Sequence, residues 1–317
     1  MGVVDSLSAG YRFLGKRLEL LLVPVLLDLL LWLAPRMSIA PLFRQLAALY
    51  IEAAQVEGFP EEMAAMSRQA ADVVEMFGES SNLLDLLVSS SLLHVPSLIV
   101  TIGPISQGRI LEIANPLAAI ALSGGLSLAG LFLGVVYMNM LARTLPIGGG
   151  PKAQDAGEFL RMAARHWLMV LLYLILMVTL LTIGAAPALL AVAVLNLVMP
   201  ALGQFLLVLF SGAVLVLFFY LYFVTAAVVM DNLPVHQAMA QSFVLVRNNF
   251  WATLGFVLLY NVISLGFALL MRQLSVWMPV GTLAAIAINA YIGSGLTMAL
   301  LVFYRTRLLK NEKYNEK

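Results

Sequence analysis

The chain has 317 residues, of which 62% are hydrophobic and only 11% are charged, and its mean hydropathy is +0.96. An ordinary soluble domain has roughly a quarter charged residues, so this composition excludes that class. The net charge of +1 provides no overall field that would attract nucleic acid, and the lack of cysteine excludes disulfides and thiolate chemistry.

Residues 1–35 are predicted to form an interfacial helix followed by a first transmembrane helix. Leu7, Tyr11 and Leu14 recur at the spacing of one helix face, opposite Arg12 and Lys16. The stretch from Leu18 to Pro35 is charge-poor, and it lacks the small-residue cleavage pattern of a secretory signal. We therefore expect this first span to be retained.

Residues 36–115 are expected to form an acidic extracytoplasmic helical insertion. The segment contains four arginines against nine acids: Glu52, Glu57, Glu61, Glu62, Asp72, Glu75, Glu79, Asp85 and Glu112. Because it occurs in only the first of the three units described below and breaks their repeat, this insertion is the best candidate for the feature that distinguishes the protein from a generic helical bundle.

Proline and glycine mark the helices of the insertion. Pro41 is predicted to begin one helix, and Pro60 with the two glutamates after it to begin a second helix that stops at Gly78. A third amphipathic piece is predicted from about Asn82 to Leu93, followed by irregular chain at His94-Val95-Pro96 and Gly103-Pro104.

An apolar stripe runs along the second predicted helix. It comprises Met63, Met66, Ala70, Val73 and Phe77. We expect the stripe to pack against the other helices of the insertion or against the bilayer, since methionine most often fills a core. A stripe that stayed exposed would instead be a partner site.

The rest of the chain alternates spans and short connections. The longest uncharged run, from His166 to Met230, has 65 residues, which is enough for two spans. The six predicted transmembrane segments are Leu18 to Pro35, Pro116 to Leu141, His166 to Ile183, Ala201 to Met230, Phe250 to Met271 and Thr282 to Tyr304. The short segment Pro187–Met199 suits an interfacial or half-inserted helix between two prolines.

The expected fold is therefore an all-α polytopic membrane bundle of six transmembrane helices. Amphipathic segments before the first, third and fifth spans indicate three parallel units, each an interfacial helix followed by a hairpin of spans. The boundaries are 116–145 for the second span, 151–230 for the second unit and 231–317 for the third unit with a basic tail, and Gly148-Gly149-Gly150-Pro151 is a flexible joint.

The basic residues predict the orientation. One side has thirteen: Arg12, Lys16, Arg17, Arg143, Lys152, Arg161, Arg165, Arg247, Arg305, Arg307, Lys310, Lys313 and Lys317. The other side has five: Arg36, Arg44, Arg68, Arg109 and Arg272. By the positive-inside rule, both termini are expected in the cytoplasm. The protein is expected to be a multi-pass protein of the plasma (inner) membrane.

Residues 234–307 resemble a known membrane domain. The resemblance is carried by Ser242, Arg247, Phe250-Trp251, Gly266, Gly281, Gly293-Ser294-Gly295 and the closing Phe303-Tyr304-Arg305. These residues look like the multi-span membrane domain that is fused to some bacterial glycerophosphodiester phosphodiesterases. The resemblance implies a helical bundle in a bacterial or archaeal plasma membrane. It does not extend to the soluble hydrolase, for which this chain has neither the length nor the polarity.

Asp28 is the main candidate functional residue. It lies about 15 Å along the first span from Glu19, and a carboxylate at that depth must be paired, protonated or hydrated. One interpretation is a proton or cation relay. The other is a structural carboxyl that is hydrogen-bonded to neighbours such as Asn139, Asn261 or Asn289.

Single amides and small residues complete the set of candidates. Asn139, Asn261 and Asn289 lie on separate spans and are interpreted as interhelical hydrogen-bonding groups. The pairs Gly130 with Gly134 and Gly293 with Gly295 are predicted helix-packing positions.

No motif in the chain indicates an enzyme or a cofactor. His94, His166 and His236 are predicted to lie too far apart to converge, so no metal site is expected. There is no H-E-x-x-H, G-x-S-x-G or phosphate-binding-loop motif either.

The sequence thus favours a non-enzymatic membrane protein that acts as a scaffold, assembly factor or accessory subunit. Its expected partners are the lipid bilayer and other membrane proteins, the latter through the acidic outer insertion. The alternative is a small transporter or lipid-handling protein that uses a central cavity, with Asp28 as the coupling group. A lipid-handling enzyme is a third interpretation, for which the sequence shows no polar cluster.

Overall fold

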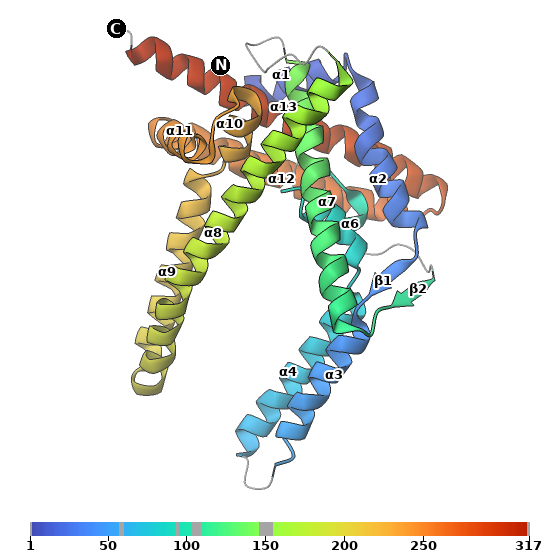
Figure 1. Cartoon of the computed structure of the whole chain (residues 1–317), viewed down its shortest axis with the longest axis vertical. Helices are drawn as coiled ribbons and strands as arrows, with labels where there is room; N and C mark the ends of the chain where they lie inside the picture. Colours follow the sequence, from blue (N-terminus) through green and yellow to red (C-terminus); the bar gives the residue numbers. More distant parts are fainter. Residues whose placement is uncertain (1, 57–59, 93–94, 103–108, 146–154, 316–317) are drawn as a thin grey trace. The chain divides into compact units, whose positions relative to one another are not determined.

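A computed structural model describes the whole chain except residues 1, 57–59, 93–94, 103–108, 146–154 and 316–317 (Figure 1). The described chain is almost wholly helical and divides into two compact units. Unit 1 consists of Met1–Leu20, Val135–Leu265 and Ser294–Lys317, and unit 2 consists of Leu21–Gly134 and Gly266–Gly293. The predicted joint at Gly148 to Pro151 and the irregular chain at His94 and Gly103-Pro104 lie outside the described residues.

Five helical segments of the described chain are long and apolar enough to cross a membrane. They are Pro116–Arg143, Ala156–Val198, Pro200–Asp231, Phe250–Ser275 and Val280–Lys310. Each of the last five predicted spans lies within one of these segments, so those five predictions are confirmed. The chain is therefore an all-α, multi-pass membrane protein.

The first predicted span has a different form. It consists of a 3₁₀ turn η1 (Leu18–Leu21) followed by the 12-residue helix α2 (Leu22–Leu33). Together they span roughly 26 Å, slightly less than the ~30 Å hydrocarbon core of a bilayer. Six spans and three equivalent units therefore stay predictions.

Five helices lie wholly in unit 1: α1 (Val3–Leu14), α8 (Ala156–Val198), α9 (Pro200–Tyr220), α10 (Val224–Asp231) and α11 (Val235–Asn248). The long helix α8 packs side by side with α9 (Figure 1). The helices α7 (Pro116–Arg143), α12 (Phe250–Ser275) and α13 (Val280–Asn315) each contribute one part to this unit. Two of the predicted amphipathic segments form the separate helices α1 and α11. The segment before the third span is instead continuous with α8.

Helix α8 begins at Asp155, whose carboxylate accepts a 2.6 Å hydrogen bond from the backbone N–H of Glu158. The helix runs for 43 residues and continues through Pro187 to Val198. The expectation of a separate helix over Pro187–Met199 is therefore wrong. A proline removes a single backbone donor, and neighbouring turns can keep a membrane helix continuous across that position.

The uncharged run ends in a buried helix. Between α9 and α10 the chain turns at residues 221–223, where the Ser242 hydroxyl donates to the carbonyl of Tyr220 at 2.8 Å and accepts from the N–H of Phe223 at 3.1 Å. Residues 224–230 are all buried, whereas α9 exposes many apolar side chains. The side chains of α9 thus suit contact with lipid, and those of α10 form protein core.

Stacked aromatic rings form the core of unit 1. The Phe303 ring of α13 lies 4.6 Å from the Phe256 ring of α12 and 5.7 Å from the Phe223 ring. All three side chains are fully buried. This packing joins helices from distant parts of the sequence around the C-terminal half of α13.

Unit 2 contains the acidic insertion. Its elements are β1 (Arg36–Ser38), α3 (Ala40–Ala53), α4 (Glu61–Ser80), η2 (Leu83–Asp85), α5 (Leu86–Ser89), α6 (Leu98–Ile102) and β2 (Ile110–Glu112). The predicted helix starts at Pro41 and Pro60 lie within one residue of the observed starts. The third piece, predicted from about Asn82 to Leu93, begins as predicted but its helical part ends at Ser89. The sequence pattern did not indicate the parallel pair β1 and β2, in which Met37 lies opposite Leu111.

Candidate functional site

The most distinctive surface of the described chain is the hairpin formed by α3 and α4. In Figure 1 the two helices lie side by side and extend beyond the N-terminal end of α7, which belongs to the same unit. Their contact is made by small residues at seven-residue spacing. These are Ala40 and Ala47 in α3, Ala54 directly after it, and Ala64, Ala71 and Gly78 in α4, all of them buried.

Close approach explains the choice of small residues. A Cβ added at Gly78 would lie 2.5 Å from the Cβ of Phe43 and 3.3 Å from the Cα of Ala40. Small side chains let two helix backbones approach closely, as they do at membrane helix interfaces. The hairpin is therefore held together by alanine and glycine, and its large apolar side chains are left for other contacts.

The predicted stripe on α4 does not pack against the other helices of the insertion, and its contact with the bilayer stays a prediction. Met66 is 69% exposed and Phe77 is 63% exposed, while the buried positions are the neighbouring Ala64 and Ala71. The stripe lies on α4 beside the row of small residues that contact α3, rotated around the helix axis by roughly 100°. Hydrophobic periodicity indicated the larger side chains, but the tight antiparallel contact selects the smaller ones.

Most of the large exposed apolar residues of both helices lie on the same side of the hairpin, whereas Ile51 and Met76 lie on the other side. At about 100° per residue, Leu46 in α3 precedes Ala47 by the same rotation by which Ala70 in α4 precedes Ala71. In an antiparallel pair, equal rotations from the shared contact place both positions on one side. The exposed residues that form this apolar hairpin face are Leu46, Leu49, Tyr50, Met63, Met66, Val73 and Phe77.

The opposite side of the hairpin has the charged residues, together with the exposed Ile51 and Met76. The acids of α3 and α4 are Glu52, Glu61, Glu62, Asp72, Glu75 and Glu79, and the only basic residues of these two helices are Arg44 and Arg68. None of these charged residues lies within the apolar hairpin face. The hairpin is thus amphipathic across its width, with a negative polar side.

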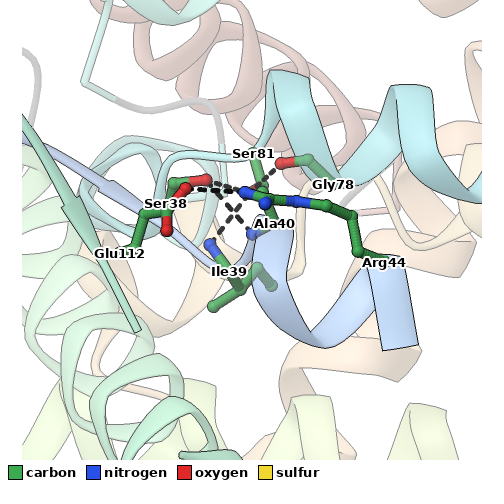
Figure 2. Close-up of polar contacts among 7 residues, drawn as sticks. All are labelled: Ser38, Ile39, Ala40, Arg44, Gly78, Ser81 and Glu112. Carbon is green, nitrogen blue, oxygen red and sulfur yellow. Dashed lines mark hydrogen bonds and ion pairs between the residues drawn. The ribbon is translucent and has the colours of Figure 1, made fainter. Parts of the chain in front are cut away.

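A polar network joins the two ends of the hairpin at its base (Figure 2). The hydroxyl of Ser81 donates to the carbonyl of Gly78 at 2.6 Å and accepts from the N–H of Ile39 at 3.1 Å. Ser38 accepts from the N–H of Ala40 at 3.2 Å. These bonds satisfy backbone groups where α3 begins and α4 ends, so they hold the base in one conformation.

Further contacts attach this base to the rest of unit 2. Arg44 reaches Glu112 of β2 at 2.6 Å, although both side chains are about half exposed and such pairs contribute little. Arg36 donates to the carbonyl of Ser81 at 2.9 Å, and the Asn82 side chain accepts from the N–H of Met37 at 3.1 Å. These contacts join the ends of α3 and α4 to β1, β2 and Asn82 in unit 2.

Asp28 lies elsewhere in unit 2 and is fully buried. Its carboxylate accepts hydrogen bonds from the Ser97 hydroxyl and, at 2.8 Å, from the backbone N–H of Leu98. Both donors lie at the start of α6. Asp28 thus satisfies backbone and hydroxyl donors of a short helix, and these partners differ from the amides that were expected.

The three candidate amides lie in different surroundings. Asn139 is buried in unit 1, where its amide donates to the carbonyl of Val135 at 2.8 Å and its oxygen lies 2.9 Å from Nδ1 of His166. Asn261 is exposed and donates to Val257 in its own helix at 2.8 Å. Asn289 is half-buried in the part of α13 that belongs to unit 2. Asn139 and Asn261 thus belong to unit 1, whereas Asp28 and Asn289 belong to unit 2.

The four candidate glycines lie against non-helical or distant chain segments. A Cβ at Gly130 would lie 2.6 Å from the carbonyl oxygens of Leu86 and Leu87, and one at Gly134 would lie 2.7 Å from that of Ser91.

On α13, Gly293 lies directly against Pro96 in unit 2, and Gly295 lies directly against the Tyr11 ring in unit 1. None of the four glycines has room for a side chain.

Two connected polar groups in unit 1 were not predicted as a site. His166 bridges Asn139 and Asn232, its Nε2 lying 3.1 Å from the Asn232 side-chain oxygen. The neighbouring Asp231 pairs with Arg305 at 2.7 Å and accepts from Tyr304 and Gln241. The signal was present, because Asp231 and Arg305 are among the first charges that follow long apolar runs.

The side chains of these polar groups make hydrogen bonds and an ion pair with one another. Within the described chain, no group of three or more His, Asp or Glu is placed to hold an ion. His236 lies on α11, and His94 lies outside the described residues. The network is best explained as a set of contacts that join α7, α8, α10, α11 and α13.

The fold and these surfaces define a multi-pass helical membrane protein with an exposed helical hairpin between α2 and α7. Comparison with protein-family models, with curated proteins and with solved structures found no match to this chain.

Proposed function

We propose that this protein is a non-enzymatic scaffold, assembly factor or accessory subunit of a membrane complex. The observation that carries the proposal is the apolar hairpin face, which lies outside the apolar helices and is exposed on an anchored hairpin. Large apolar patches on an ordered surface are typical of interaction sites. The resemblance of residues 234–307 to a membrane domain agrees with a membrane role that does not require catalysis.

The proposal includes a location and a topology. We place the protein in the plasma (inner) membrane with both termini in the cytoplasm, because basic residues are concentrated on that side. Since both termini then lie on one side, η1 and α2 together form a sixth, short span. The acidic insertion then lies outside the cytoplasm, and the three units share one orientation.

The alternative function is a small transporter or lipid-handling protein with Asp28 as the coupling group. A coupling carboxylate must exchange protons or ions during each cycle. The hydrogen bonds from Ser97 and Leu98 give Asp28 a structural task instead, which supports the scaffold over the transporter.

The experiment is native mass spectrometry of the protein after gentle solubilisation from its own membrane. We expect a stoichiometric protein companion that is lost in the double variant Leu46→Gln/Met66→Gln. The control Ala48→Gln/Asp72→Asn, on the other side of the hairpin, should retain the companion. A retained lipid or small solute without any protein companion would favour the transporter.

A further inference from the structure

The apolar hairpin face has the properties of a surface that pairs with an identical copy. Its residues come from both helices and lie along most of the hairpin, from Phe77 near the base to Met63 near the tip. An isologous interface requires a surface that is complementary to itself. An uncharged face meets this requirement, since no like charges are brought together when two copies meet.

Charge argues against a lipid surface as the occupant. Amphipathic helices that lie on membranes usually have lysine and arginine on their polar side. Here the polar side of α3 and α4 has six acids and two arginines. Anionic headgroups would repel such a hairpin, whereas a second hairpin would leave both acidic sides in water.

The geometry of the hairpin fits a four-helix arrangement. The start of α3 lies beside the end of α4, since Ala40 and Phe43 contact Gly78. Residues later in α3 therefore lie beside residues earlier in α4. A half-turn about an axis parallel to the helices places α3 of one copy over α4 of the other. Two such hairpins then form an antiparallel bundle with the apolar residues inside.

The exposed area is sufficient for this pairing. The seven side chains of the face are between 39% and 69% exposed. Together they offer on the order of 700 Å² for each copy, close to the roughly 800 Å² per partner of a standard specific interface.

We propose that two copies of this chain pair through the apolar hairpin face and form an extramembrane four-helix bundle. The inference rests on the proposed function and specifies the first protein that occupies the face. Dimerisation would cover the exposed methionine, leucine and phenylalanine side chains, and would leave both acidic sides free for further partners.

Disulfide cross-linking tests the pairing directly, because the natural chain contains no cysteine. Two differently tagged copies are expressed in the same cells, one with Leu46→Cys and the other with Ala70→Cys. These positions face each other across the proposed interface. The control pair is Ala48→Cys with Asp72→Cys, at similar heights on the polar side. After mild oxidation, cross-linked products that contain both tags are measured on non-reducing gels.

The proposal expects a reducible product with both tags for the first pair, at least tenfold more abundant than for the control pair. Equal yields from the two pairs would overturn it. A photo-reactive amino acid in place of Met66 then separates the two proposals. Cross-linking of Met66 to a different protein overturns the dimer and supports the proposed function, whereas cross-linking to lipid alone overturns both.

Discussion

At the scale of single residues, Asp28 shows how a buried carboxylate can be explained by its neighbours. The residue is fully buried, and its carboxylate accepts hydrogen bonds from the Ser97 hydroxyl and the Leu98 N–H at the start of α6. Depth in an apolar helix normally indicates function. The hydrogen bonds from Ser97 and Leu98 favour the interpretation of Asp28 as a structural carboxyl over that of a relay.

We therefore expect Asp28→Leu to lower the free energy of unfolding by about 3 kcal/mol, because two buried donors lose their acceptor. Asp28→Asn keeps one acceptor oxygen and should cost about 1–2 kcal/mol. The measurement is chemical denaturation in detergent micelles, with Ser97→Ala as a milder reference. Unchanged stability of Asp28→Asn with loss of a transport activity would support the relay instead.

A second carboxylate, Asp85, predicts a pH dependence at the base of the hairpin. Burial raises the pKa of Asp85, and the Asn82 hydrogen bond and the charge of Arg36 oppose this shift. A raised pKa means that the folded state favours the protonated form. The free energy of unfolding contributed by this group should therefore increase as the pH falls through the raised pKa.

The test compares thermal unfolding midpoints at about pH 7 and about pH 5. In Asp85→Asn this part of the pH dependence should disappear, and the variant should be the more stable protein at the higher pH. Asp72→Asn, on the exposed side of α4, is the control for a change of net charge. A midpoint that shifts equally with pH in all three proteins would contradict the prediction.

At the scale of elements, the α3 and α4 hairpin depends on the absence of side chains at its contact. Gly78→Leu would place a side chain where the Cβ of Phe43 already lies. Overpacking of this kind costs about 1–3 kcal/mol. We expect the base of the hairpin to open and residues 40–80 to exchange amide hydrogens at least tenfold faster, as measured by mass spectrometry.

Gly125→Leu on α7 is the matched control for this variant. A Cβ at Gly125 has no heavy atom within 4 Å, so the same substitution meets open space. Equal exchange in the two variants would show that the close contact at Gly78 does not stabilise the hairpin.

At the scale of the whole molecule, the number of spans decides the topology. Five spans would place the two termini on opposite sides of the membrane, whereas a crossing by α2 would place them together. We predict that Ser8→Cys and Lys310→Cys react with an impermeant maleimide only after the membrane is opened. Arg68→Cys should react in intact cells. Reaction of Ser8→Cys and Arg68→Cys from the same side would exclude the sixth span.

The sequence by itself determined the class of this protein. A run of 65 uncharged residues cannot be a soluble surface, and proline and acidic residues located the starts of α3 and α4 to within two residues. These features depend on composition and on local backbone chemistry. Both can therefore be read along the chain without knowledge of distant contacts.

Only the tertiary structure decided which residues meet. Periodicity placed the large side chains of α4 on one stripe, but the contact with α3 used Ala64, Ala71 and Gly78 and left that stripe exposed. Likewise, the partners of Asp28 come from a segment about 70 residues away. Packing and hydrogen bonding between distant segments depend on which backbones can approach closely, and that property belongs to pairs of elements rather than to either sequence alone.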